Sequence, residues 1–220
     1  MMKIEKLKTS KLFYNKWPYK VTCRLEHATS VYGRTYSWAY YSYRNNISDE
    51  DLENVEKFRK AFDPFTKKNI KYRAEYNHFN IFCDDKVLLE KIYKKLKPWI
   101  QKVYGPSSDE ELEYLKENGH KKRVCDAFPK GKYQYRVYLK TNLQDATKES
   151  FLNWALKYED KIEISRSTKL WLDGTRKWFS APFMYVKDGS TLSMVGLFLG
   201  NNVKLVEEFV LRESINTPSE

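Results

Sequence analysis

The sequence predicts an α+β protein built from two similar halves. Phe79-Asn80-Ile81-Phe82-Cys83-Asp84, which precedes a helical pattern, is matched 104 residues later by Phe183-Met184-Tyr185-Val186-Lys187-Asp188. A second pair lies 116 residues apart and matches Trp17-Pro18-Tyr19-Lys20-Val21 with Tyr133-Gln134-Tyr135-Arg136-Val137. A loop insertion accounts for the difference between the two offsets. In both halves, stretches with strand periodicity and stretches with helix periodicity follow one another. We therefore expect two copies of one α/β unit.

In the first half, residues 1–10 are expected to form an arm or an edge strand. A strand is predicted over residues 12–26 and a strand or hairpin over residues 70–83. Between them, Ser48 and three acidic residues are typical of a helix N-terminus, and Asp63-Pro64 ends that helix. Asp84-Asp85 is expected to cap a further helix, because a carboxylate accepts hydrogen bonds from the first amides of a helix.

The second half gives the clearer order of elements. Strands are predicted at 133–140, 162–172, 178–186 and 203–212, and helices at 146–158 and 190–199. The order strand-helix-strand-strand-helix-strand is that of the ferredoxin-like unit, and the first half fits it with insertions. We therefore expect two tandem ferredoxin-like units, residues 1–129 and 130–220, joined at Pro129-Lys130-Gly131. Each would be an antiparallel sheet with helices on one face and an open second face.

The charge of the chain favours a polyanionic partner. It has 40 Lys and Arg against 29 Asp and Glu, a net charge of +11, so its field attracts nucleic acid first and an anionic membrane second. Cys23, Cys83 and Cys125 have no metal-ligand spacing and are odd in number, so neither zinc, another cofactor nor a disulfide framework is expected. With no signal-peptide pattern and no apolar stretch of about 20 residues, we expect a soluble, cytoplasmic protein with no membrane partner.

An alternating aromatic and basic stretch is the strongest candidate for a binding surface. Large side chains of one parity alternate with small ones, so on a strand they would share one face. These residues are Tyr32, Arg34, Tyr36, Trp38, Tyr40 and Arg44. Aromatic rings stack on bases whatever the sequence, and arginines bind phosphates. The alternative is that the rings form the core of a half-buried hairpin.

A basic turn supplies a second candidate contact. Lys121, Lys122 and Arg123 follow Gly119-His120, and no acidic residue beside them in the sequence neutralises their charge. We expect this run to contact phosphate.

One constellation could carry catalysis. His78-Phe79-Asn80 on a predicted strand, with Tyr93 and Lys97 on the following helix, resembles the HUH family of rolling-circle replication endonucleases. The resemblance implies a metal held by the strand and a nucleophilic tyrosine on the helix. Asn80 stands where that family has its second histidine, and only fifteen residues separate His78 from Tyr93. The other interpretation is an ordinary strand histidine and a structural tyrosine.

The sequence thus favours a non-enzymatic protein that binds single-stranded DNA or RNA through its open sheet faces. Its richness in Lys, Asn and Tyr is typical of an AT-rich genome and suggests a phage, virus or mobile element, with a role in replication or genome handling beside other viral or replication proteins in the host cytoplasm. Two alternatives remain. One is a metal-dependent HUH-like endonuclease or replication initiator, and the other is a structural or assembly protein whose aromatic surface contacts proteins.

Overall fold

The computed structural model describes residues 4–32, 47–118 and 121–216. The chain divides into two compact units, Met1–Glu117 and Asn118–Glu220, each with its own five-stranded sheet. This division falls earlier than the one expected after residue 129. The reason is that β6 (Lys122–Cys125) pairs with β10 (Val203–Leu211) and so belongs to the second sheet.

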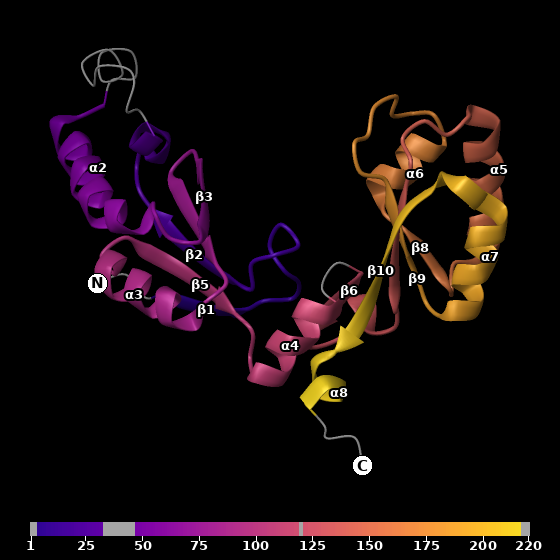
Figure 1. Ribbon diagram of the computed structural model, residues 1–220. Helices are drawn as coiled ribbons and strands as arrows, with labels where there is room; N and C mark the ends of the chain where they lie inside the picture. The colour runs from indigo at the N-terminus through magenta and orange to yellow at the C-terminus, as the bar shows by residue number, and fades with distance from the viewer. Residues whose placement is uncertain (1–3, 33–46, 119–120, 217–220) are drawn as a thin grey trace. The chain divides into compact units, whose positions relative to one another are not determined.

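Unit 1 contains a sheet in the order β1-β5-β2-β4-β3, in which only β1 and β5 run parallel. Its helices α2 and α3 lie on one side of that sheet (Figure 1). The elements are β1 (Glu5–Lys8), β2 (Tyr19–Arg24), the 3-10 helix η1 (Ala28–Tyr32), α2 (Asp49–Phe62), η2 (Asp63–Phe65), β3 (Ile70–Glu75), β4 (His78–Cys83), α3 (Lys86–Leu96), β5 (Ile100–Gly105) and, at the boundary, α4 (Asp109–Asn118).

The predicted helix caps of this unit are confirmed. Ser48 Oγ accepts a hydrogen bond from the amide of Asp51 at 3.1 Å. The Asp85 carboxylate accepts from the amides of Val87 and Leu88 at 2.9 and 3.1 Å. Each cap satisfies amides that have no partner within the helix and so fixes where the helix begins.

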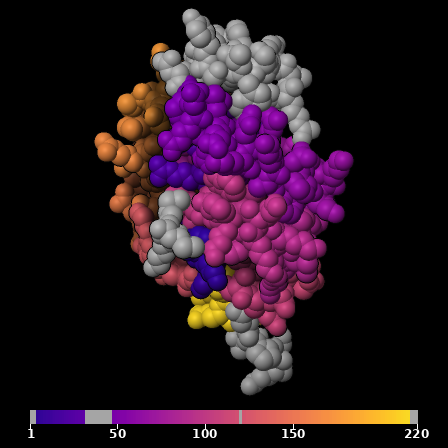
Figure 2. All heavy atoms as spheres, turned by 90° about the vertical axis from the view of Figure 1, so that its left-hand side faces the viewer, coloured from indigo at the N-terminus to yellow at the C-terminus, as the bar shows by residue number. Residues whose placement is uncertain are grey.

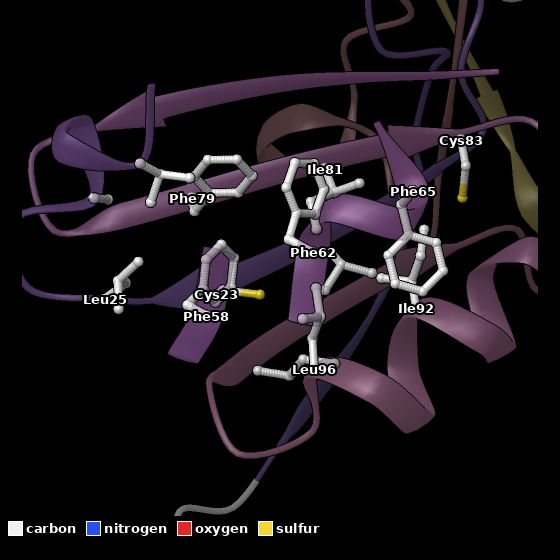
Figure 3. Close-up of a cluster of buried hydrophobic side chains, with 14 of the residues drawn as sticks. Cys23, Leu25, Phe58, Phe62, Phe65, Phe79, Ile81, Cys83, Ile92 and Leu96 are labelled. Atoms are coloured by element: carbon white, nitrogen blue, oxygen red, sulfur yellow. The ribbon is translucent and has the colours of Figure 1, made fainter. Parts of the chain in front are cut away.

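The core of unit 1 lies between its sheet and its two helices. Phe58 and Phe62 of α2 pack on Phe79 of β4 with ring centroids 5.0 and 4.9 Å apart, and Ile92 of α3 closes the cluster (Figure 3). Such edge-to-face pairs add about 0.5–1.5 kcal/mol each to the burial itself. Figure 2 shows the outside of this unit, where violet atoms of the α2–β3 region lie above magenta atoms of α3. The helices thus cover one face of the sheet.

Unit 2 contains a sheet in the order β6-β10-β7-β9-β8, in which only β6 and β10 run parallel. Side chains of α5 and α7 pack on one face and bury Val137 and Met184 completely. The elements after β6 are η3 (Pro129–Gly131), β7 (Tyr135–Leu139), α5 (Asp145–Ala155), η4 (Leu156–Tyr158), β8 (Ile162–Ile164), α6 (Arg166–Leu172), β9 (Phe183–Val186), α7 (Gly189–Leu199), η5 (Gly200–Asn202), β10 and α8 (Arg212–Asn216).

The strand predicted over residues 162–172 was wrong beyond Ile164. Ser165 Oγ accepts a hydrogen bond from the amide of Thr168 at 3.3 Å and so begins α6. The Thr168 hydroxyl is buried and both donates to the carbonyl of Phe183 at 2.9 Å and accepts from its amide at 3.0 Å. A side chain therefore replaces the strand pairing at the start of β9. Pro129–Gly131, the expected linker, is a turn within unit 2.

The two sheets share one topology. The order β5-β2-β4-β3 in unit 1 corresponds to β10-β7-β9-β8 in unit 2, and each sheet has one parallel strand added at the same edge. Tyr19 pairs with Cys83 as Tyr135 pairs with Val186. The offset of 116 residues between β2 and β7 therefore holds, whereas β4 and β9 are related by 103 residues and not 104. A slip of one residue exchanges the faces of a strand.

Candidate nucleic-acid interface

Each unit has one sheet face opposite the described helices that form its core, α2 and α3 in unit 1 and α5, α6 and α7 in unit 2, and we call it the open face. In unit 2 the residues of β7 and β9 alternate, so that Val137 and Met184 point to the helices while their neighbours point away. The side chains on the open face of unit 2 include Arg123 of β6, Arg136 and Tyr138 of β7, Glu163 of β8, Phe183 and Tyr185 of β9, and Leu205, Glu207 and Phe209 of β10.

Arg136 occupies the centre of the open face of unit 2. Its guanidinium carbon lies 5.1, 4.9 and 5.4 Å from the ring centroids of Phe183, Tyr185 and Phe209. It donates hydrogen bonds to the Tyr185 hydroxyl at 2.5 Å and to the Tyr138 hydroxyl at 3.3 Å. These contacts fix the cation among aromatic rings, an arrangement that strengthens cation–π attraction because the site is partly desolvated.

One carboxylate balances two arginines at this site. Glu207 Oε2 lies 3.5 Å from Arg123 Nη2 and 3.8 Å from Arg136 Nη1, and it accepts a hydrogen bond from the Tyr138 hydroxyl at 3.2 Å. Among the described residues, the Nε atoms of Arg123 and Arg136 are buried and have no hydrogen-bond acceptor. These three charges leave one net positive charge at the partly buried centre of this face, while Glu163 at its edge is paired with Lys130. The centre therefore favours an anion.

The open face of unit 1 has a similar centre. The Lys20 ammonium lies 5.7 Å from the centroid of Phe82 on β4 and 5.2 Å from that of Tyr104 on β5. Burial lowers the pKa of Lys20, as does the neighbouring Lys102 to a smaller extent, while Glu75 opposes the shift. A cation is therefore held here too beside aromatic rings.

A tight turn of unit 1 folds over this face. Phe13 and Trp17 exchange two backbone hydrogen bonds of 2.8 and 2.9 Å, and Tyr14 and Asn15 take left-handed φ angles of 53° and 56°. The rings of Phe13 and Tyr14 lie 5.5 and 5.1 Å from that of Phe82, which is only 4% exposed. The turn thus covers the middle of this open face, whereas Tyr138, Phe183 and Tyr185 on the open face of unit 2 stay partly exposed.

The aromatic stretch proposed from the sequence falls almost entirely outside the described residues. Tyr32 is the last residue of η1. Arg34, Tyr36, Trp38, Tyr40 and Arg44 belong to residues 33–46, which the structure does not describe. Its assignment to a binding strand stays a prediction.

The basic turn is partly neutralised, contrary to expectation. Lys121 is exposed, but Lys122 forms an ion pair of 3.7 Å with Glu208, and Arg123 forms the pair with Glu207. Both glutamates come from β10, which lies beside β6 in the sheet although it is about 85 residues away in sequence. Local sequence does not show such a partner.

The HUH-like residues are placed on different faces of unit 1. His78 and Asn80 alternate with the buried Phe79, so they lie on the open face, and Asn80 bonds Thr22 at 2.9 Å and Glu75 at 3.2 Å. Tyr93 is on α3, partly buried against the core on the other side of the sheet, and Lys97 is exposed at the end of α3. The structure does not bring His78 and Tyr93 together. Over residues 4–32, 47–118 and 121–216, no group of three or more His, Cys, Asp or Glu side chains is arranged to hold a metal.

Sequence reasoning missed the aromatic and basic residues at the centre of unit 2. A signal for them exists, because Arg136 and Tyr138 alternate with Val137 and Leu139 just as Phe183 and Tyr185 alternate with Met184 and Val186. That period of two predicts one apolar face and one aromatic, polar face.

Comparisons with protein-family models, with curated proteins and with solved structures find no match. Within the part of the chain that is described, no helix has the length and apolar character to cross a membrane.

Proposed function

We propose that the protein binds single-stranded nucleic acid through the open faces of two tandem ferredoxin-like units. The ferredoxin-like assignment is supported by the sheet order β10-β7-β9-β8 and its equivalent in unit 1, because a strand-helix-strand-strand-helix-strand chain with its first and third strands in the centre has this arrangement. The composition supports a setting in replication or genome handling of a phage, virus or mobile element.

The open face of unit 2 is the observation that carries the proposal. Tyr138, Phe183 and Tyr185 present partly exposed rings on two neighbouring strands, with Arg136 between them. Stacking of a base on such a ring contributes about 1–3 kcal/mol whatever the base. Partly exposed rings can stack on the faces of unstacked bases, which single strands expose and duplexes hide.

The charge pattern fits the same ligand. At the centre of the open face of unit 2, Arg123 and Arg136 outnumber Glu207, and Glu163 at its edge is paired with Lys130. On the open face of unit 1 the exposed Lys71 stands on the edge strand β3, where its neighbour Arg73 forms an ion pair of 2.8 Å with Glu75. Cations placed beside stacking rings bind the phosphates that connect stacked bases. Binding should therefore depend on salt and show little preference for sequence.

The test is fluorescence anisotropy with labelled single-stranded and duplex oligonucleotides across a salt titration, with Mg²⁺ or Mn²⁺ in half of the samples. We expect tighter binding of single strands, a steep loss of affinity with salt and no cleavage. The Tyr185→Leu variant should bind more weakly, whereas Leu156→Ala, a change on the helix side of unit 2, should not. Absence of binding at low salt would overturn the proposal, and metal-dependent cleavage would turn it toward a nuclease.

A second candidate, an assembly protein, is favoured by α7. This helix has no charged residue, whereas the equivalent α3 has five, and Leu197 is 88% exposed on it. A neutral apolar helix is the surface through which two copies of a chain with charge +11 meet with least repulsion. Sedimentation at increasing concentration should then show a dimer that resists high salt and that Leu197→Lys dissociates. A monomer at all concentrations would reject this candidate.

A further inference from the structure

A second candidate site in unit 2 lies in the loop that joins α6 to β9. This loop, residues 173–182, is drawn in orange beside α6 in Figure 1. Its ends are held by backbone hydrogen bonds, from the amide of Arg176 to the carbonyl of Leu170 at 2.6 Å and from the amide of Leu139 to the carbonyl of Pro182 at 2.9 Å. The Asp173 carboxylate also accepts from the amide of Thr175 at 2.9 Å. The loop is therefore anchored to the sheet and to α6 at both ends.

A pocket of about 600 Å³ opens in this loop. It is lined by Thr141, Trp171, Lys177, Trp178, Phe179 and Ser180. This size lies within the range of roughly 300–1,000 Å³ that small-molecule sites occupy. Trp171 is 1% exposed and belongs to the core, so it forms a fixed wall, whereas Trp178 is 90% exposed. The exposed indole of Trp178 beside the buried indole of Trp171 therefore leaves a large apolar surface that the described residues do not cover.

The chemistry of the lining is that of a nucleotide site. The exposed Trp178 indole and the partly exposed Phe179 ring offer stacking surfaces for a base. The hydroxyls of Thr141 and Ser180 both donate and accept hydrogen bonds, as base edges and sugars require. Lys177 lines the pocket and Arg176 lies beside it, with its guanidinium carbon 5.4 Å from the ring centroid of Phe179. None of the described residues that line the pocket is acidic, so the charge that a phosphate meets in this lining is that of Lys177.

We infer that this pocket binds one nucleotide, with its base against Trp178 and its phosphate at Lys177 and Arg176. The nucleotide is either free or part of a strand, because the shared chemistry is an aromatic base joined to a phosphate. The inference does not depend on the open sheet faces, since Trp171, Lys177 and Trp178 are not among their residues. A lipid surface, the other ligand that suits exposed tryptophan beside lysine, would not need the walls and hydroxyls that this pocket has.

The test is calorimetric titration of the full chain with adenosine and thymidine monophosphates, the matching nucleosides and ribose 5-phosphate, while NMR follows the tryptophan indole N–H signals. We expect saturable binding of the monophosphates with a shift of the signal assigned through Trp178→Phe. Trp178→Ala should weaken binding at least tenfold, and Trp178→Phe should retain most of it. Lys177→Gln should weaken the monophosphates more than the nucleosides, and Lys169→Gln, an exposed lysine of α6 outside the pocket, should change neither.

Further samples separate the sources of the ligand. In one outcome, a short oligonucleotide is the only ligand that shifts the Trp178 signal, with no shift from free monophosphates. That result would assign the pocket to a nucleotide within a strand. The inference is overturned if neither ligand shifts that signal. It is also overturned if the signal shifts only with vesicles of phosphatidylserine and phosphatidylcholine. Because Trp178 is almost fully exposed, its replacement should leave the fold intact, which circular dichroism checks. If Arg136→Gln abolishes strand binding but monophosphates still bind, the pocket and the open face act as separate sites.

Discussion

Lys20 of β2 and Arg136 of β7 occupy the same position in the two sheets. Lys20 pairs with Phe82 on one side and Tyr104 on the other, and Arg136 pairs with Tyr185 and Glu207. Each cation lies over the ring of its partner on the neighbouring central strand, at 5.7 Å in unit 1 and 4.9 Å in unit 2. The two units therefore share a cation–aromatic pair at the centre of the open face and differ in the second neighbour.

The two open faces differ in this second neighbour of the central cation, which is Tyr104 in unit 1 and Glu207 in unit 2. In unit 1 the neighbour is another ring, and the turn with Phe13 packs on it at 5.9 Å. In unit 2 the neighbour is a carboxylate that holds two arginines in place. We expect the open face of unit 2 to contribute more to ligand binding, because Tyr138, Phe183 and Tyr185 stay partly exposed there.

Replacing the central arginine should weaken binding of single strands. Arg136→Gln removes one cation beside three rings, and we expect about a tenfold loss of affinity for an oligonucleotide at low salt. The slope of log affinity against log salt should decrease by about 0.7, the value for one phosphate contact on a single strand. Anisotropy measures both. Arg166→Gln, an exposed arginine of α6, is the matched control, and equal effects of the two changes would contradict an interface on the open face.

Replacing Glu207 should change stability and affinity in opposite directions. Its side chain is 6% exposed and balances Arg123 and Arg136, so Glu207→Gln leaves two guanidinium groups without a shared anion. We expect the free energy of unfolding in urea to decrease by about 1–3 kcal/mol and the affinity for oligonucleotides to increase. Glu149→Gln, on the exposed surface of α5, should alter neither quantity. A loss of affinity in Glu207→Gln would show that the carboxylate positions the arginines and does not compete with the ligand.

The cap of α7 should make stability depend on acid pH. Asp188 accepts hydrogen bonds from the amide and the hydroxyl of Thr191 at 2.8 and 2.9 Å, which hold its pKa below the ordinary value of 3.8. Because the folded pKa is lowered, this contribution is present above the unfolded pKa and is lost as pH falls through the folded one.

Asp188→Ala should accordingly cost about 1 kcal/mol of unfolding free energy at pH 7. The cost should be the same at pH 5 and smaller below the unfolded pKa of about 4. Urea titrations at these pH values measure it, with Asp160→Ala, an exposed carboxylate outside the helices, as control. A cost that does not shrink in acid would mean that the charge of Asp188 is not what caps α7.

The three cysteines should differ in reactivity. Burial raises the pKa of Cys23 to about 12, and burial together with Asp84 and Asp85 raises that of Cys83 to about 12. Since the thiolate is the reactive form, neither should react with iodoacetamide at pH 8 in the folded protein. Cys125 is only partly buried, although burial raises its pKa as well, and should be alkylated first. Mass spectrometry of native and urea-unfolded samples checks the order, and modification of Cys23 at its unfolded rate would contradict the buried core of unit 1.

Local signals in the sequence determined the type and position of most elements. Ser48 and Asp85 predicted the beginnings of α2 and α3, and the alternation of Tyr135–Leu139 predicted β7, because caps and periodicity act over a few residues. The two matched segments also predicted that the chain repeats one order of elements. The candidate site in unit 2 was not predicted, because the alternation that marks it covers only the short strands β7 and β9.

The tertiary structure alone decided which distant residues meet. The sequence match related β4 to β9 by 104 residues, but hydrogen bonding in the sheet relates them by 103, and this single residue places Phe79 in the core and Phe183 on the open face. Glu207 reaches Arg123 only because β10 pairs with β6. The Thr168 hydroxyl accepts a hydrogen bond from the amide of Phe183, the first residue of β9, only because α6 lies beside that strand. Pairing between strands far apart in sequence depends on the packing of the whole sheet, which no short stretch of residues encodes.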